Sequence, residues 1–444
     1  MKHKKLLAVH LNEFNYDYLK YGAKKYKLKN IKKLLAFKKI RTFTKDKTQN
    51  KNLDPWVQSV SINTGIPSKK HKIFKLGQKL DNNIYFIWDI LIKKKVDCFI
   101  WGSINSNFIK NKYIKIFFPD PWNYTSNVIP NDLKELHILP KYYAKNYTET
   151  EINKIVKYSF LFLKSFIKNK GINFMFKNFY LIFHSLLSRG LKNYLLFFLF
   201  DLISLDIFKQ KINSKNSCFS YIFLNSLAHF QHNNWNDIIA EKYYFLYTDK
   251  IIKSIFDIYK SHDALFIFNG FSQKKIKDEF ILRPKNPSKF LKKIIYFTSI
   301  EQDMTNGGFI FFNDKKSANI AFDKIKNYNV CGIKIFEALQ KKDLSFFYRI
   351  MIKSKKDLNM TGTNSINKKN LSNFFYYENK NKKIKIKFNS IELSEFLNSI
   401  QFIKTTGIHS TNGEIIFDNL KTITKKKSIE NHKIFNIFKN FFNN

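Results

Sequence analysis

Three short apolar segments, each followed at once by polar residues, constrain the fold of this chain more than any other feature of its sequence. The segments and the residues that follow them are Lys5–His10 with Asn12-Glu13, Ser220–Leu224 with Asn225, and Leu265–Phe268 with Asn269-Gly270. Apolar segments of this length are typical of buried parallel strands, whose carboxyl ends meet at one edge of an open sheet where ligands bind. The sequence therefore predicts an α/β fold with a site at that edge.

Helical patterns separate these predicted strands. The clearest begins at Asp54-Pro55, because Asp is a good N-cap and Pro fits the first helical position, and it ends at Thr64-Gly65, where Gly supplies the stop. The other predicted elements are the helices Tyr18–Phe37, Ile84–Lys94 and Asp237–Lys260, the polar loop Thr42–Asn52 and the strand Asp97–Trp101. This order predicts a doubly wound, mostly parallel sheet with helices on both faces.

The chain is expected to form a single α/β domain over residues 1–440, with two insertions. Residues 130–215 are Phe-rich and strand-poor, and predict a helical insertion. Residues 296–355, with the strand Gly308–Phe312 and the helix Ala318–Ile325, predict a small α+β cap. Residues 356–383 are rich in Lys and Asn and predict a mobile linker. The last element that the pattern indicates is Thr405–Phe417.

The charge balance is strongly basic, with 78 Lys and Arg against 34 Asp and Glu in 444 residues, a net charge of +44. A charge of this size attracts nucleic acid, anionic membranes and anionic esters. However, Asn, Ile, Phe and Tyr are frequent together with Lys, while Gly and Pro are scarce, which is typical of an A+T-rich coding bias. The charge is also spread along the chain. Nucleic-acid binding is therefore expected only through net charge.

Cysteines and apolar segments indicate the compartment. Cys98, Cys218 and Cys331 are odd in number and far apart, so they predict buried thiols in a reducing compartment. The apolar run Leu6–Leu11 is too short for a signal peptide, and the apolar region Tyr158–Phe208 is interrupted by charged residues, so neither predicts a membrane span. We expect a cytoplasmic protein. Attachment to a membrane surface through Lys and Phe stays open, as does the oligomeric state.

Four sequence segments together resemble the alkaline-phosphatase-like superfamily, which includes type I phosphodiesterases/nucleotide pyrophosphatases, sulfatases and phosphomutases. They are the Asp54–Ile73 segment with Thr64-Gly65 and His71, then Asn225-x-x-x-His229, Asn269-Gly270, and His409 within Gly407–Gly413. The first is similar to the nucleophile helix of the family, the second to its Asp-x-x-x-His metal motif, and His409 to its last metal-binding His. Glu13-Phe14-Asn15 resembles an uncharacterised bacterial branch of this superfamily.

The resemblance implies a metal site that is only partly intact. Active members hold two divalent metals, and a Thr or Ser at the helix N-terminus attacks the ester. Here Glu13 replaces the first Asp, His229 and His409 keep two imidazole ligands, and Asn225 offers a neutral oxygen. The Asn269-Gly270 pair lacks an imidazole, so we expect one divalent metal, zinc, manganese or magnesium, rather than two.

The residue at the nucleophile position, nine before Thr64, is Pro55, which cannot attack. Asp54 or Glu13 is the predicted catalytic group that orients or deprotonates water, and His232 and Asn269 are predicted to bind substrate. His232 lies one helical turn after His229, so both can face the same pocket.

Four functions fit this pattern. They are a one-metal hydrolase of a phosphate or sulfate ester, a transferase acting on a phosphorylated glycan or lipid, a catalytically inactive pseudoenzyme that binds an anionic ligand or partner, and a basic nucleic-acid-binding protein.

Overall fold

The structure, a computed structural model, divides the chain into two compact units. One comprises Met1–Lys275 and Gly407–Asn444, and the other comprises Ile276–Thr406. The described residues are 3–48, 52–81, 83–303, 306–330, 333–354, 375–379, 382–385, 396, 398–420 and 427–443. The first unit contains two apolar core clusters among its described residues, and the second contains one. The single domain over residues 1–440 stays a prediction.

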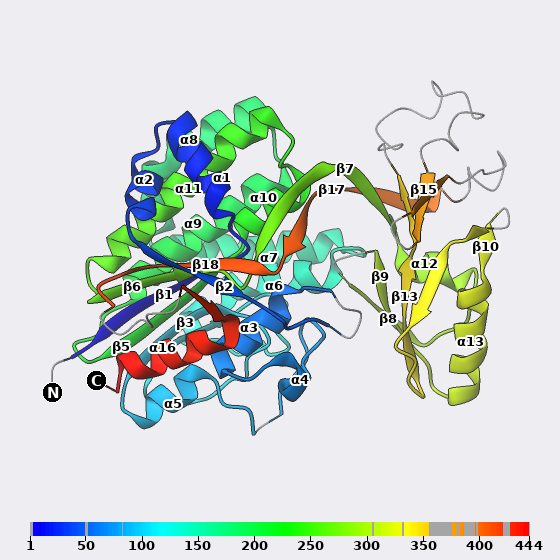
Figure 1. Cartoon of the computed structure of the whole chain (residues 1–444), viewed down its shortest axis with the longest axis horizontal. Coiled ribbons are helices and arrows are strands. Elements are labelled where there is room, and N and C mark those ends of the chain that lie inside the picture. Colours follow the sequence, from blue (N-terminus) through cyan, green and yellow to red (C-terminus); the bar gives the residue numbers. More distant parts are fainter. Residues whose placement is uncertain are drawn as a thin grey trace. The chain divides into compact units, whose positions relative to one another are not determined.

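An eight-stranded sheet forms the centre of the first unit (Figure 1). Its order is β19-β2-β18-β6-β1-β5-β3-β4. The strands are β1 (Lys5–Leu11), β2 (Lys38–Phe43), β3 (Asp97–Ser103), β4 (Ile114–Pro119), β5 (Cys218–Leu224), β6 (Ala264–Phe268), β18 (Asn412–Asp418) and β19 (Ser428–Glu430). The pairs from β6 to β4 are parallel, while β18 runs antiparallel to β6 and β2. The predicted α/β class with a mostly parallel, doubly wound sheet is confirmed.

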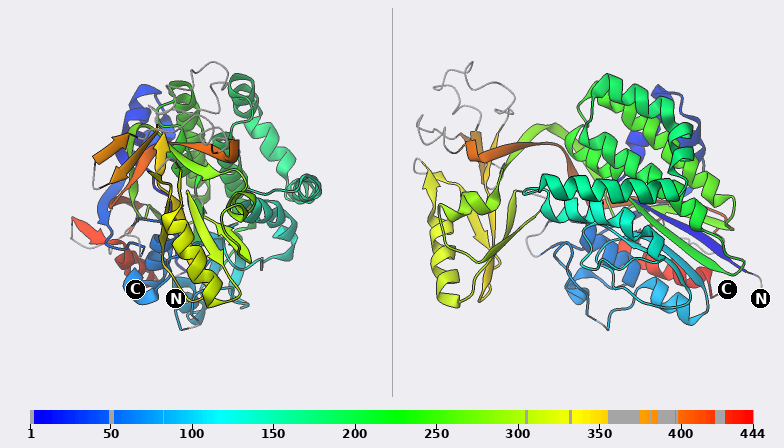
Figure 2. Two further views of the ribbon diagram at one scale, coloured as in Figure 1. Left: turned by 90° about the vertical axis from the view of Figure 1, so that its right-hand side faces the viewer. Right: turned by 180° about the vertical axis from the view of Figure 1, so that it is seen from behind.

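Alternation along the strands divides the core into two layers. Leu7 and Val9 of β1 belong to one apolar cluster and Leu6 and Ala8 to the other, because successive side chains of a strand point to opposite faces. The first cluster is covered by α1 (Tyr16–Lys25), α2 (Lys29–Leu35), α6 (Lys134–Asn146), α7 (Ile152–Lys168), α8 (Gly171–Arg189), α9 (Asn193–Lys211), α10 (Ser226–Asn233) and α11 (Ile238–Tyr259). The second is covered by α3 (Pro55–Thr64), α5 (Ile87–Lys93) and α16 (Ile434–Phe441). Figures 1 and 2 show helices on both sides of the sheet.

Local differences from the sequence-based expectation occur at three places. The predicted helix Tyr18–Phe37 is two helices, α1 and α2, because Lys27 takes a left-handed conformation with φ 52° between them. The first two residues of the predicted loop Thr42–Asn52 end strand β2. The chain also continues past Phe417 into β19, the short helices η3 (Asn431–Lys433) and α16, which are too short to give a clear period. The insertion 130–215 is helical, as predicted, with η1 (Asn131–Leu133) preceding α6.

The second unit contains an α+β core of the predicted kind. A four-stranded sheet has the order β12-β13-β9-β8 and antiparallel pairs, and α13 packs into its apolar cluster. A five-stranded sheet has the order β16-β15-β14-β7-β17. The elements are β7 (Ser272–Pro284), α12 (Pro287–Lys292), β8 (Ser299–Gln302), β9 (Gly307–Phe311), α13 (Lys315–Asn327), β10 (Asn329–Val330), β11 (Ile333–Lys334), β12 (Phe336–Leu339), β13 (Ser345–Ile350), β14 (Ile352–Ser354), β15 (Phe375–Asn379), β16 (Lys382–Lys385) and β17 (Ile400–Ser410).

Some predictions fall outside the described residues. The predicted linker 356–383 lies mostly outside them, and so does Cys331. Cys98 and Cys218 are buried free thiols, as predicted. Within the described part of the chain, no helix is both long enough and apolar enough to cross a membrane.

Candidate metal centre

The carboxyl ends of β6, β1 and β5 lie side by side in the sheet and bring the predicted polar residues to one edge. The backbone N–H of Asn12 donates to the carbonyl of Leu224 at 2.9 Å, which continues the β1–β5 pairing past the strand ends. The side-chain amide of Asn12 then donates to Asn225 Oδ1 at 2.7 Å and to Glu13 Oε1 at 3.1 Å. The first strand and the fifth therefore place Glu13 and Asn225 in one hydrogen-bonded network.

Three ligand-type atoms converge beside this network. Glu13 Oε2 lies 3.0 Å from His232 Nε2 and 3.2 Å from His409 Nε2, and the two imidazole nitrogens lie 3.2 Å apart. Four ligands bound tetrahedrally at about 2.0–2.2 Å from a zinc ion lie about 3.3–3.6 Å from one another. The observed triangle is within a few tenths of an ångström of that spacing. Glu13, His232 and His409 thus form a candidate metal site, here called the His-His-Glu triangle.

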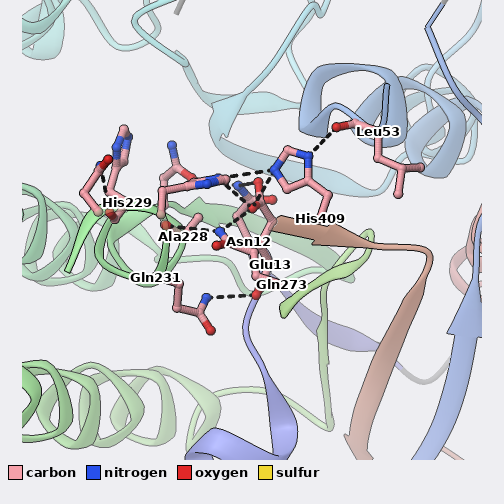
Figure 3. A network of polar contacts seen from close by, with 11 residues as sticks. Asn12, Glu13, Leu53, Ala228, His229, Gln231, Gln273 and His409 are labelled. Atoms are coloured by element: carbon pink, nitrogen blue, oxygen red, sulfur yellow. Dashed lines mark hydrogen bonds and ion pairs between the residues drawn. The ribbon is translucent and has the colours of Figure 1, made fainter. Parts of the chain in front are cut away.

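Glu13, one corner of the triangle, is held in a strained backbone conformation. Its φ of 55° lies in the left-handed region, which non-glycine residues rarely adopt. Gln231 Nε2 donates to the Glu13 carbonyl at 3.0 Å, and Gln273 Nε2 donates to Glu13 Oε2 at 2.6 Å and to the Ala228 carbonyl at 3.1 Å. These contacts, drawn in Figure 3, fix the direction of the carboxylate.

Electrostatics keep the Glu13 carboxylate charged. Its side chain is 2% exposed, and burial alone would raise its pKa. The neighbouring imidazoles of His409 and His232 nevertheless hold that pKa well below its usual range, through charge and hydrogen bonding. A buried carboxylate with this bias favours a cationic partner, either imidazolium or a metal ion.

His409 is oriented by the backbone. Its Nδ1 contacts the carbonyl of Leu53, and because a carbonyl only accepts, Nδ1 carries the proton. Nε2 then faces Glu13 and His232: protonated, it donates to the Glu13 carboxylate, and deprotonated, it offers its lone pair to a metal ion. An imidazole whose other nitrogen donates to a carbonyl is the usual arrangement around protein-bound metals. Burial lowers the pKa of His409, but Glu13, Asp54 and the Leu53 carbonyl together raise it above its ordinary value.

The predicted metal ligand His229 does not join the triangle. Its ring stacks on Phe197 with the centroids 3.6 Å apart, and burial lowers its pKa to about 3. Figure 3 shows its ring apart from Glu13 and His409. His232, three residues later on the same helix, points about 60° away from the direction of His229, and it is His232 that reaches Glu13. The sequence indicated that both could face the pocket, and the structure places His232 there.

The other predicted site residues lie close to the triangle or support it. Asn225, a predicted metal ligand, is linked to Glu13 by the side-chain amide of Asn12, which donates both to Asn225 Oδ1 and to Glu13 Oε1. Asn269, predicted to bind substrate, uses both amide atoms on backbone: Nδ2 donates to the Phe14 carbonyl and Oδ1 accepts from Glu414 N–H, each at 2.7 Å. Gly270 faces α3, where an added Cβ would meet Gln58 Cβ at 2.8 Å. There is no room at Gly270 for a second-metal imidazole.

Asp54 stands at the amino end of α3, as predicted, yet its side chain makes no capping hydrogen bond with the helix. It follows Leu53, whose carbonyl contacts His409, and its charge raises the pKa of that histidine. Pro55 occupies the first helical position. Ser61 bonds to the Val57 carbonyl and to His71, so it is committed within the helix and its turn.

Sequence reasoning missed the residues that hold Glu13. Asn12, Gln231 and Gln273 belong to no recognisable sequence motif. Only their closeness to Glu13 and to the two histidines could have indicated them. Gln273 follows the predicted strand Leu265–Phe268 by a few residues, which places it near the same sheet edge.

No protein-family model matches the sequence, and no curated protein matches it. Solved structures similar to the chain include the alkaline phosphatase from the Antarctic bacterium TAB5, at 10% identity and a TM-score of 0.40 over 100% of this chain and 99% of that one. Human ectonucleotide pyrophosphatase/phosphodiesterase 5 is 9% identical with a TM-score of 0.46, and phosphonoacetate hydrolase from Sinorhizobium meliloti 1021 is 9% identical with a TM-score of 0.40; each comparison covers 99% of this chain and 95% of the other. The names of these structures include an alkaline phosphatase and a nucleotide pyrophosphatase/phosphodiesterase, which are kinds of protein that the sequence motifs resemble. At these identities and scores the likeness carries no information about activity.

Proposed function

We propose that this chain is a metal-dependent hydrolase that uses one divalent cation to cleave a phosphate ester. The observation that supports the proposal best is the His-His-Glu triangle, whose three ligand atoms lie 3.0–3.2 Å apart at the carboxyl edge of a parallel sheet. Two histidines and one carboxylate, with a further position open to water, form a frequent ligand set of catalytic zinc. The His232 and His409 side chains are 32% and 22% exposed, which leaves a path for solvent and substrate.

Among the residues that the structure describes, the sheet edge offers one metal position rather than two. The residues at the second position of the resembling motif are Asn269, whose amide holds two backbone segments, and Gly270, which packs on Gln58. A single cation supplies a Lewis acid and lowers the pKa of a bound water toward neutrality. The proposal therefore does not need a second metal.

The surrounding side chains have defined tasks in this mechanism. Glu13 provides the negative charge that holds the cation, and Leu53 keeps the His409 lone pair directed at it. Asp54, next to Leu53, is the group proposed to accept a proton from the attacking water. The amino end of α3 favours negative charge on the ester oxygens through the helix dipole and its backbone N–H groups. Because Pro55 replaces a nucleophilic side chain, water attacks the phosphorus directly, the P–O bond to the alcohol breaks, and the proton that Asp54 has accepted returns to the departing alkoxide.

A second candidate is a non-catalytic protein of the same fold that binds an anionic ligand. It is favoured by one observation, Pro55 at the position where the resembling family has its nucleophile. Turnover distinguishes the two candidates, because both keep the metal site.

The test combines metal content with turnover in matched variants. Purified protein is stripped with a chelator and reloaded with zinc, manganese or magnesium, and bound metal is measured by plasma mass spectrometry. Hydrolysis of bis-p-nitrophenyl phosphate, p-nitrophenyl phosphate and p-nitrophenyl sulfate follows. We expect His232→Ala and His409→Ala to weaken metal binding by about 100-fold or more, while His229→Ala, on the same helix as His232, keeps it. Unchanged metal content in His232→Ala contradicts the proposed site, and full metal binding without turnover supports the non-catalytic candidate.

A further inference from the structure

The helical insertion exposes an unusual amount of apolar surface on α7 and α8. On α7 the exposed apolar residues recur every three or four positions: Ile152, Val156, Phe160, Leu163 and Ile167. On α8 the exposed apolar residues lie on one side of the helix, because they follow one another at spacings of one, three or four positions: Ile172, Met175, Phe176, Phe179, Tyr180, Phe183 and Leu187. Phe176 is 79% exposed and Phe160 is 69% exposed. Each helix thus carries an apolar stripe that faces solvent in the described structure.

These stripes are second faces of helices that are already packed. On α8, Phe174, Ile182 and Ser185 are buried, and Ser185 bonds to the hydroxyl of Tyr247 at 2.8 Å. On α7, Phe166 is buried and contacts Phe174 edge-to-face. The inner faces anchor both helices in the first unit, so the outer stripes are not required for folding. Figure 2 shows this insertion at the outside of the unit, in teal and green.

The stretch of sequence that carries the stripes has charge of one sign, while Lys154, Lys164 and Arg189 pair with Glu151, Glu135 and Asp237 outside it. None of the 34 acidic residues of the chain lies between Ile152 and Phe200. The same stretch carries these basic residues: Lys154, Lys157, Lys164, Lys168, Lys170, Lys177, Arg189 and Lys192. All of them except Arg189 are exposed. The rest of the chain mixes both signs, so a coding bias toward Lys does not account for the missing carboxylates.

We propose that α7 and α8 bind the surface of an anionic lipid bilayer, with the apolar stripes in the headgroup region and the lysines against lipid phosphates. Amphipathic helices with aromatic residues on one face and Lys on the other bind membranes in this way, and anionic lipids strengthen the attachment. Neither helix is both long and apolar enough to cross the bilayer. A second copy of the chain would set two like-charged surfaces against each other. Nucleic acid would engage the lysines and leave the apolar stripes uncovered.

Vesicle partitioning of the full chain tests the proposal. Vesicles of phosphatidylcholine alone are compared with vesicles that also contain phosphatidylserine, at low and high salt. We expect binding to the anionic vesicles that is reduced but not abolished by high salt, since apolar insertion is not screened. The paired substitution Phe176→Glu with Phe179→Glu should lower the partition coefficient by about tenfold or more. The matched control, Tyr296→Glu with Ile320→Glu, changes two other exposed apolar residues, 80% and 60% exposed, and should change partitioning by less than about twofold.

Three outcomes overturn the proposal. The first is that the Phe176/Phe179 variant and the wild type partition equally, and the second is that high salt abolishes binding completely. The third is that the chain does not bind vesicles but self-associates with rising concentration, and that the same variant abolishes this self-association. Thermal unfolding of each variant shows that it is folded, because substitutions at exposed positions leave the core intact.

A second measurement reads insertion directly. Phe176→Trp adds an exposed tryptophan to a chain whose Trp56, Trp88, Trp101 and Trp235 are buried and whose fifth tryptophan, Trp122, is half-buried. Lipids brominated on their acyl chains should quench the additional fluorescence of this variant, while the wild-type emission changes little. Equal quenching of both proteins contradicts insertion at this position. Neither measurement depends on metal binding or hydrolysis, so this proposal can fail while the proposed function holds.

Discussion

At the scale of single residues, the site depends on side chains that orient a proposed metal ligand without binding the metal themselves. Gln273 donates to Glu13 Oε2 and to the Ala228 carbonyl, and it is fully buried. Glu13 itself has a left-handed backbone, a conformation that persists only where neighbours over-determine it. The direction of the Glu13 carboxylate is therefore a property of its partners.

Gln273→Ala should show this dependence. Removal of a buried donor leaves the carboxylate short of one hydrogen bond, so we expect a loss of about 1–3 kcal/mol in the free energy of unfolding and about tenfold weaker metal binding. Urea unfolding and metal titration measure the two effects. Gln210→Ala, at an exposed position on α9, is the control and should change neither. Normal metal affinity in Gln273→Ala would show that Glu13 is oriented without Gln273.

Asp120 links stability to pH. Burial raises its pKa from 3.8 to about 7, although its hydrogen bond from the Trp122 N–H and the nearby Lys141 oppose the shift. The folded chain therefore binds more protons than the unfolded chain between these two values, and the free energy of unfolding falls as pH rises through this window. Asp120→Asn removes this titrating group. The free energy of unfolding of the variant should therefore rise by about 1–3 kcal/mol relative to that of the wild type between about pH 4 and pH 8. Denaturant midpoints at several pH values measure it, and a pH-independent difference contradicts the assignment.

At the scale of elements, α3 decides which chemistry the sheet edge can support. Its first residue is Pro55, its amino end lies beside the Leu53 carbonyl that orients His409, and its Gln58 fills the space at Gly270. One helix thus excludes both a side-chain nucleophile and a second metal imidazole.

Two substitutions test the role of α3. Asp54→Asn should lower kcat by about 100-fold while metal content stays the same, because the proton acceptor is lost and the ligands remain. Stopped assays with plasma mass spectrometry on the same samples measure both. A proportional loss of metal would instead make Asp54 a ligand.

Gly270→Ala should destabilise the packing of α3 on the sheet edge. The new methyl would approach Gln58 Cβ to 2.8 Å, close to the helix backbone where little relaxation is available. We expect a loss of about 1–3 kcal/mol in urea unfolding. Ser188→Ala, at an exposed position on α8, is the control. A neutral effect at Gly270 would mean that the helix can shift and that a larger side chain fits.

The sequence predicted the sheet edge better than the ligands that it carries. Apolar segments such as Lys5–His10 and Ser220–Leu224 have the length and composition of buried strands, so the positions of Glu13 and Asn225 followed from chain order alone. The choice between His229 and His232 did not, since both lie within one turn of α10 and only its rotation against β1 separates them. Helix α16 was missed because eight residues are too few for a period.

At the scale of the whole molecule, the chain keeps its candidate site within one compact unit. Glu13, His232 and His409 all belong to the unit formed by Met1–Lys275 and Gly407–Asn444. Gly407 lies close to Gln273, where an added Cβ would meet Gln273 Oε1. The two chain ends left by removal of the second unit are therefore near each other.

Replacement of residues 276–406 by a short Gly/Ser linker should leave a folded protein that binds metal with an affinity within about threefold of the full chain, because no ligand is removed. Circular dichroism and metal titration measure this. An unfolded product would show that the two units depend on each other, in line with the single domain predicted from the sequence. The cytoplasmic location and nucleic-acid binding through net charge stay predictions.

The most direct measurement of the central claim is zinc-edge X-ray absorption, together with anomalous diffraction, on the metal-loaded protein. The proposed site predicts one zinc per chain, bound by two imidazole nitrogens and one carboxylate oxygen, with an anomalous peak between Glu13, His232 and His409. A peak at His229, two metal peaks at the sheet edge, or no bound metal would contradict it.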